Sequence, residues 1–286
     1  MSSAVNVAES GTITLGGELT VNRLGFGAMR VTGRGVWGPP PDEDQARAIL
    51  RRVVEAGVNF IDTADSYGPD VSERLIGEAL RPYPKGLVIG TKGGQVRPGP
   101  NRWVPNGRPE HLREALEGSL SRLGLETIDL YQFHRPDPKV PFEESVGELV
   151  RLKEEGKIRL IGLSNVSIAQ LEAAQKLTPV ASIQNRFNLD DRSSDRVLEA
   201  VERQGIAFLP WAPLGGTAGS TGAVLEEIAR AHDATVNQTV LAWLLALSPV
   251  MLPIPGTGSL EHLEENLRAA SLHLTEAELS RLNAAR

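Results

Sequence analysis

Short apolar runs alternate with amphipathic segments along the whole chain, and this alternation limits the fold more than any other feature. The alternation begins after a small hairpin, Thr12–Val21, which turns at Gly16-Gly17. Strands joined by crossover helices must run parallel, and eight such units in 286 residues favour a closed barrel over an open sheet. We therefore predict an α/β fold, a (β/α)8 TIM barrel with an N-terminal β-hairpin, formed by one domain over residues 1–286.

The expected elements follow from periodicity and from the glycines that end helices. The expected strands are Leu24–Gly27, Asn59–Asp62, Leu87–Thr91, Ile128–His134, Arg159–Ser164, Val180–Asn185, Ile206–Trp211 and Val250–Pro255. The expected helices are Asp44–Glu55, Glu73–Leu80, Glu110–Leu123, Phe142–Glu155, Ile168–Leu177, Asp195–Gln204, Ala223–Ala231, Asn237–Ala246, Leu260–Ala269 and one from about Glu276 to the end. Three long irregular stretches follow strands, namely Arg30–Pro41, Gly93–Arg108 and Pro213–Thr221. They should lie together on the face of the barrel that carries active sites.

Composition excludes several classes of function. The chain has no cysteine, so disulfides, thiolate metal sites and cysteine nucleophiles are ruled out. Its five histidines form no ligand pair of helical or strand spacing, so no metal site is expected. A net charge of −6 argues against nucleic-acid or membrane partners. No secretory signal or spanning segment is readable, so a cytoplasmic location is expected.

Polar side chains gather at the ends of consecutive expected strands. Asp62 ends the second strand with Tyr67 just beyond it, Lys92 ends the third, and His134 ends the fourth. Each of them alone has an ordinary structural explanation, such as a helix cap or a solvated cation. Together they predict chemistry, because an ammonium beside a phenol favours phenolate and lowers the tyrosine pKa from about 10. Such a tyrosine can protonate a forming alkoxide, and a nicotinamide hydride would complete the set.

These residues lie in motifs that resemble the aldo-keto reductase family. The stretch from Asn59 to Gly68, followed by Glu73 and Gly77, is similar to the family signature. Lys92, His134, the run from Gly162 to Asn165, and Pro213-Leu214-Gly215 match in order and spacing. The resemblance covers nearly the whole chain and implies a tetrad of Asp62, Tyr67, Lys92 and His134, with Tyr67 as proton donor.

The same resemblance implies how a nicotinamide cofactor is held. It implies that Ser164, Asn165 and Gln184 hydrogen-bond the carboxamide and that Trp211 stacks on the ring, where the family more often has tyrosine. A Rossmann turn is not used, because Gly25-Phe26-Gly27 lacks the third glycine. The full set of cofactor contacts that we expect is Met29, Ser164, Asn165, Gln184, Trp211, Pro213, Leu214, Gly256, Thr257, Ser259, His262, Glu265 and Asn266.

The segment after the last expected strand departs from the family pattern. Members that prefer NADPH carry lysine where this chain has Gly256 and arginine where it has His262. Thr257, Ser259, His262 and backbone amides remain available to bind a 2′-phosphate, without a permanent charge clamp. We expect NADP as the cofactor, with NADPH favoured over NADH.

The substrate is expected to be a small carbonyl compound. Its pocket walls would come from Met29, Trp37, Trp103 and the stretch Pro213–Thr221. The stretch from Val21 to Arg30 and the run from Val36 to Pro40 are similar to bacterial family members that reduce pyridoxal to pyridoxine. The physiological substrate and the oligomeric state stay open, with a monomer slightly favoured.

Two other functions remain open. A non-catalytic barrel of the potassium-channel β-subunit type would keep the cofactor site, although the intact tetrad weighs against it. An isomerase or aldolase could use Lys92 as a Schiff-base lysine, but this would leave Trp211 and the set Ser164, Asn165 and Gln184 without a role.

Overall fold

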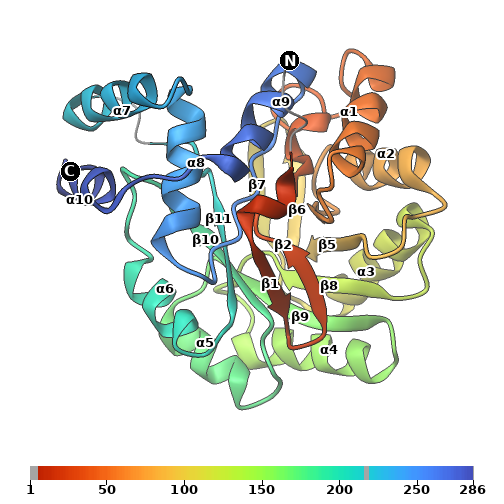
Figure 1. Cartoon of the computed structure of the whole chain (residues 1–286). Helices are drawn as coiled ribbons and strands as arrows, with labels where there is room; N and C mark the ends of the chain where they lie inside the picture. The colour runs from red at the N-terminus through yellow and green to blue at the C-terminus, as the bar shows by residue number, and fades with distance from the viewer. Residues whose placement is uncertain (1–5, 216–218, 286) are drawn as a thin grey trace.

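The computed structural model describes residues 6–215 and 219–285, and its parallel strands curl into a barrel surrounded by helices (Figure 1). The strands of the main sheet follow one another in the order β11-β10-β9-β8-β5-β4-β3. Their bounds are β3 Phe26–Gly27, β4 Phe60–Asp62, β5 Val88–Gly93, β8 Ile128–Phe133, β9 Ile158–Ser164, β10 Ser182–Arg186 and β11 Ala207–Trp211. All neighbours pair in parallel, so the carboxyl ends of these strands meet at one end of the barrel.

The helices that connect and flank these strands begin and end close to the expected positions. They are α1 Glu43–Glu55, α2 Val71–Leu80, α3 Pro109–Leu123, α4 Phe142–Glu154, α5 Ile168–Gln175, α6 Asp195–Glu202, α7 Gly219–Ala231, α8 Val236–Leu247, α9 Leu260–Arg268 and α10 Glu276–Ala284. Local sequence explains several ends: Asp42 caps α1 by accepting from the Gln45 amide, and Gly124 ends α3 in the left-handed region. Short 3-10 turns lie at Val7–Ser10, Ala28–Val31 and Ala269–Ser271.

The predicted eighth strand, Val250–Pro255, is not a regular strand. It makes a single bridge, between Met251 and Phe208 of β11. Even so, it closes the barrel, because Leu252 N–H donates to Phe208 O at 2.9 Å and Gly25 N–H donates to Pro253 O at 2.9 Å. Pro253 and Pro255 have no N–H to donate, so the segment cannot form a complete ladder on both sides.

The predicted N-terminal hairpin is confirmed as β1 Thr12–Leu15 and β2 Leu19–Asn22. Its turn residues Gly16 and Gly17 both have positive φ, at 55° and 75°. A Cβ on Gly16 would come within 2.6 Å of Leu160 Cδ2, so the turn packs directly against β9. Figure 1 shows this two-stranded hairpin in red, lying across the barrel strands.

The expectation of an irregular stretch over Gly93–Arg108 is wrong. That stretch contains an antiparallel hairpin of β6 Gln95–Gly99 and β7 Arg102–Pro105. Pro98 and Pro100 obscure the alternating pattern in the sequence, and the register shifts between Val96 and Gly99. In the stretch Pro213–Thr221, residues 216–218 lie outside the described residues, and α7 begins at Gly219 rather than at Ala223.

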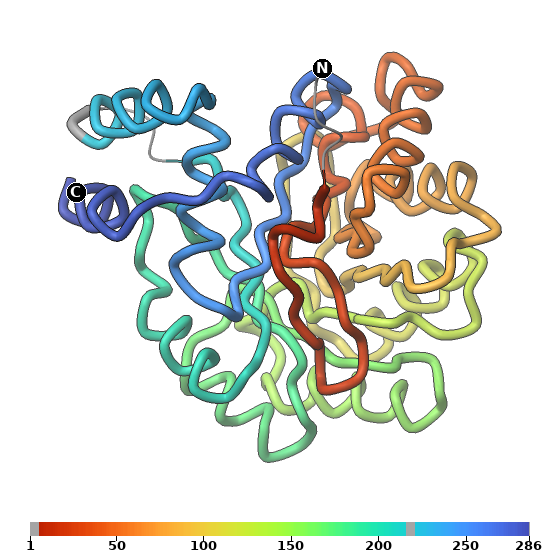
Figure 2. Tube along the Cα trace, viewed as in Figure 1, coloured from red at the N-terminus to blue at the C-terminus, as the bar shows by residue number. Residues whose placement is uncertain are grey.

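Helix α9, near the C-terminal end of the chain, lies beside α1 on one side of the barrel. Figure 2 shows the blue helix α9 beside the red and orange N-terminal part of the chain. Arg52 of α1 forms a salt bridge with Glu264 of α9. Within residues 6–215 and 219–285, no helix is long and apolar enough to cross a membrane.

Candidate active site

The polar residues at the strand ends lie together because the strands are parallel and in register. The chain after β4 continues to pair with β5, since the Thr63 and Asp65 N–H groups donate to Gly90 O and Lys92 O. This extension carries the chain to Tyr67 directly over the end of β5. The sequence-predicted group of Asp62, Tyr67, Lys92 and His134 is therefore brought to one site.

Lys92 is the central charge of the site and is fully buried. Its Nζ donates to Asp62 Oδ2 at 2.6 Å, to Thr63 O at 2.8 Å and to the Tyr67 hydroxyl at 3.2 Å. All three ammonium protons thus have partners. Because the ammonium cannot rotate away without losing these bonds, it is fixed beside the phenol oxygen.

The pKa values at this pair differ in part from the prediction. Burial disfavours the charged form of Lys92, but the carboxylate of Asp62 and the phenol of Tyr67 outweigh it and raise the lysine pKa. For Tyr67 the sequence predicts a lowered pKa, and this is wrong. Burial raises the pKa of the phenol more than Lys92 lowers it. Tyr67 therefore remains protonated at neutral pH and holds a proton that it can donate.

His134 lies beside the phenol as an uncharged ring. Its ring centroid is 5.9 Å from that of Tyr67, and Ser66 Oγ is 3.4 Å from its Nδ1. Burial, followed by the charges of Lys92, Arg135 and Arg97, holds the pKa of His134 well below its usual value. A neutral imidazole can donate one hydrogen bond to a substrate oxygen without competing for a proton.

Asp62 is held from the side opposite Lys92 by two amides. Gln132 and Gln184 each donate Nε2–H to Asp62 Oδ1 at 2.9 Å. Sequence reasoning did not identify Gln132, although its place in a buried strand, two residues before His134, was a signal. Gln184, predicted as a carboxamide contact, donates its amide N–H groups to Asp62 Oδ1 and to Gln132 Oε1.

Asn165, Ser164 and Trp211 form a connected set at the ends of β9 and β11, which lie on either side of β10. Asn165 has a positive φ of 59°, which turns its side chain back over the strand ends. Its Nδ2 donates to His134 O and to Ser164 Oγ, and its Oδ1 accepts from Trp211 Nε1 at 3.1 Å. The partly exposed indole of Trp211 is therefore fixed at the end of β11.

Two further tryptophans lie on the other side of Tyr67. Trp37 and Trp103 are 37% and 36% exposed, which is unusual for side chains of this size. The Trp103 ring is 6.2 Å from the Tyr67 ring at 87° and 6.2 Å from the His134 ring. The predicted pocket residues thus form an open aromatic wall next to the phenol.

In the segment that precedes α9, side-chain oxygens accept from backbone N–H groups. Ser259 caps the helix by accepting from His262 N–H, and Thr257 Oγ1 accepts from Ser259 N–H. A Cβ on Gly256 would be 2.2 Å from Gly27 O. The close approach of β3 therefore requires a glycine at this position.

The remaining predicted cofactor residues occupy varied positions. Asn266 is buried on α9, whereas the Glu265 carboxylate accepts from Thr235 Oγ1 at 2.6 Å. Pro213 is buried and Leu214 half-buried in the turn after β11, and Met29 is half-buried in the 3-10 turn after β3. These three residues therefore come from the turns next to the Tyr67 and Trp211 strand ends.

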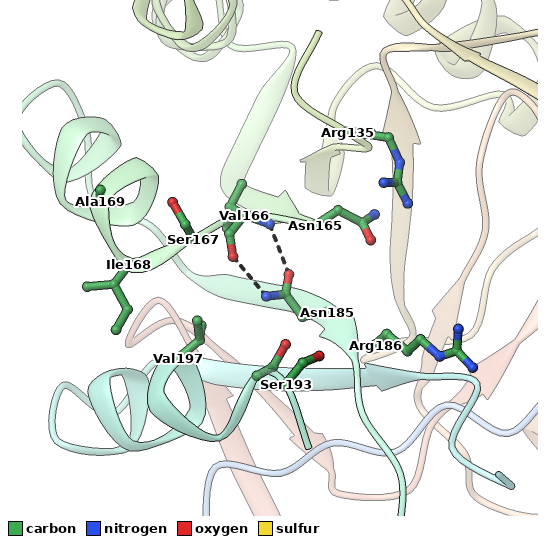
Figure 3. Close-up of a pocket in the computed structure, with 11 residues that line it drawn as sticks. Arg135, Asn165, Val166, Ser167, Ile168, Ala169, Asn185, Arg186, Ser193 and Val197 are labelled. Atoms are coloured by element: carbon green, nitrogen blue, oxygen red, sulfur yellow. Dashed lines mark hydrogen bonds between the residues drawn. The ribbon is translucent and has the colours of Figure 1, made fainter. Parts of the chain in front are cut away.

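A separate groove opens beside the site, between the starts of α5 and α6 (Figure 3). Asn185 spans it, with its side chain bonded to both the N–H and the carbonyl of Val166. Arg135 and Arg186 stand at the end nearest Asn165. Among the described residues, no cluster of three histidine, aspartate or glutamate side chains is arranged to hold a metal ion.

Comparison with known proteins gives a consistent result. The model of the aldo/keto reductase family matches residues 23–286. An uncharacterized oxidoreductase of Schizosaccharomyces pombe is 50% identical over 99% of this chain and 92% of its own length. The pyridoxine 4-dehydrogenase of Escherichia coli is 41% identical over 96% of this chain and 98% of its own length.

Solved structures agree with these relatives. A thermostable aldo-keto reductase in complex with the inhibitor epalrestat superposes with a TM-score of 0.84 at 34% identity, covering 96% of this chain and 99% of that one. An aldo-keto reductase of Klebsiella pneumoniae in complex with NADPH gives 0.80 at 26% identity, covering 95% and 93%.

Proposed function

Because the chain belongs to the aldo/keto reductase family, we propose that it reduces an aldehyde or ketone to an alcohol with a nicotinamide cofactor. The observation that carries the proposal is the Lys92 ammonium 3.2 Å from the hydroxyl of a buried, protonated Tyr67. The family match over residues 23–286 also supports one barrel domain.

Tyr67 donates the proton in this proposal. As hydride reaches the carbonyl carbon, charge develops on the carbonyl oxygen, and the phenol delivers its proton there. The fixed ammonium of Lys92 stabilises the phenolate that remains. His134 directs the substrate oxygen toward Tyr67 through a hydrogen bond from its neutral ring, while Asp62 keeps Lys92 charged.

The donor set at the barrel mouth fits a nicotinamide dinucleotide. The partly exposed indole of Trp211, together with Ser164 in β9 and Gln184 in β10, suits the ring and its carboxamide. The first turn of α9, with Thr257 and Ser259, suits phosphate. When bound, the cofactor supplies the hydride.

We propose NADPH as the preferred cofactor. Support comes from the Klebsiella pneumoniae relative in complex with NADPH and from the exposed His262 at the start of α9. Measuring kcat/KM with NADPH and with NADH, at saturating aldehyde, tests this directly. Equal values, or a preference for NADH, would overturn it.

We propose pyridoxal as a substrate. The similarity to the pyridoxine 4-dehydrogenase of Escherichia coli supports this, and the open aromatic wall of Trp37 and Trp103 suits a flat aromatic aldehyde. Purified protein should oxidise NADPH with pyridoxal faster than with an aliphatic aldehyde of similar size. Turnover of the aliphatic aldehyde without turnover of pyridoxal would reject this substrate but retain the reductase.

A further inference from the structure

Arg97 of β6 is a buried cation whose partners are all neutral. Its side chain forms no ion pair with a carboxylate among residues 6–215 and 219–285, and the residue is 8% exposed. Nε donates to Arg102 O at 2.8 Å, Nη1 to Val36 O at 2.8 Å and to Ser66 O at 3.1 Å, and Nη2 to Gly35 O at 2.9 Å. Four of the five guanidinium protons are thus held by backbone carbonyls.

These carbonyls belong to three separate segments around the mouth. Gly35 and Val36 lie in the long loop after β3, Ser66 directly precedes Tyr67, and Arg102 begins the second strand of the hairpin. Gly35 and Val36 both have positive φ, at 73° and 54°. A valine is strained in that region, so the loop needs an external partner to keep this conformation.

The same guanidinium contacts both tryptophans of the aromatic wall. Its Cζ lies 3.6 Å from the Trp103 ring centroid and 5.9 Å from that of Trp37. Trp103 in turn meets the Tyr67 and His134 rings edge-on. One side chain therefore ties the two exposed tryptophans to the backbone beside the proton donor.

We propose that Arg97 is a positioning residue, which fixes the loop, the hairpin and the Tyr67 segment to one another and thereby shapes the substrate pocket. No other residue type matches the four contacts. Lysine has three donors on a single atom and cannot reach carbonyls spread around a planar fork. The inference rests on the proposed reductase function for its kinetic part only.

The first test is structural and does not depend on activity. We compare hydrogen exchange of backbone amides in wild type, Arg97→Met and Arg102→Met. The Arg102 side chain lies exposed on the same hairpin, so this control removes the same charge without removing the contacts. Exchange in the segments 33–38, 66–68 and 99–105 should accelerate at least about tenfold in Arg97→Met and stay at the wild-type rate in Arg102→Met. Unchanged exchange in Arg97→Met would overturn the proposal.

The second test separates positioning from a general loss of activity. Arg97→Met should raise the aldehyde KM about 10- to 100-fold and lower kcat by a smaller factor, with the Kd for NADPH unchanged. A fall in kcat with an unchanged KM would contradict a pocket-shaping role. Arg97→Lys keeps the charge, so it serves where the methionine variant fails to fold, and it should show the same rise in KM. A wild-type KM for aldehyde in Arg97→Lys would overturn the proposal, because the positive charge would then shape the pocket without the planar guanidinium. If the wild-type protein turned over no aldehyde, the proposed reductase function would be rejected. The hydrogen-exchange test of the positioning role of Arg97 would still be valid.

Discussion

Lys92 Nζ lies 3.2 Å from the Tyr67 hydroxyl and 4.9 Å from the centroid of the same ring. The ammonium is therefore near the edge of the phenol that bears oxygen, where its charge acts on the ionising atom. Burial keeps Tyr67 protonated, and Lys92 stabilises the phenolate that proton donation produces.

Tyr67→Phe removes only the hydroxyl. We expect kcat for an unactivated aldehyde to fall about 10²- to 10⁴-fold, because the general acid is lost. The Kd for NADPH, measured by fluorescence titration, should remain at the wild-type value. Retention of most of the rate would show that another group donates the proton.

Lys92→Met leaves the Asp62 carboxylate buried with only amide partners. We expect the free energy of unfolding to fall by about 3–5 kcal/mol in urea titrations, because one half of a buried ion pair is removed. Asp62→Asn in the same chain should restore much of this stability, while activity stays low. Recovery of activity in the double variant would contradict the role of the ammonium.

The depressed pKa of His134 links stability to pH. The unfolded chain takes up a proton near pH 6.5, whereas the folded ring resists protonation because of burial and the charges of Lys92, Arg135 and Arg97. Stability should therefore be fully present above about pH 6.5 and fall as pH drops below it, by up to about 1.4 kcal/mol per pH unit for this group. His134→Gln should flatten that slope in urea titrations between pH 5 and 8, and an unaltered slope would assign it to other groups.

Two substitutions that would each add a cation near the start of α9 should have different effects. His262→Arg should increase NADPH affinity several-fold with little effect on NADH, because an exposed cation at the start of α9 can pair with a 2′-phosphate. Gly256→Lys should instead destabilise the protein without that gain, since its Cβ would meet Gly27 O at 2.2 Å. Isothermal titration with both nucleotides and a thermal melt distinguish these outcomes.

The alternation of apolar runs and the order of polar strand ends were enough to predict the barrel and to group Asp62, Tyr67, Lys92 and His134. Both depend on strand periodicity and on the fact that parallel strands end on the same side. The same reasoning overestimated the last strand, because prolines at 253 and 255 allow barrel closure without a regular ladder.

Only the tertiary structure decided the direction of the pKa shifts and the contacts between residues that are distant in the sequence. The direction of the Tyr67 pKa depends on burial against Lys92, and burial is a property of the packed fold. Gln132 on Asp62 and Arg97 on three loop segments join residues between 5 and 70 positions apart, so no local pattern marks them. The sequence determined which chemical groups reach the mouth of the barrel, whereas packing determined which of them touch and how each is charged.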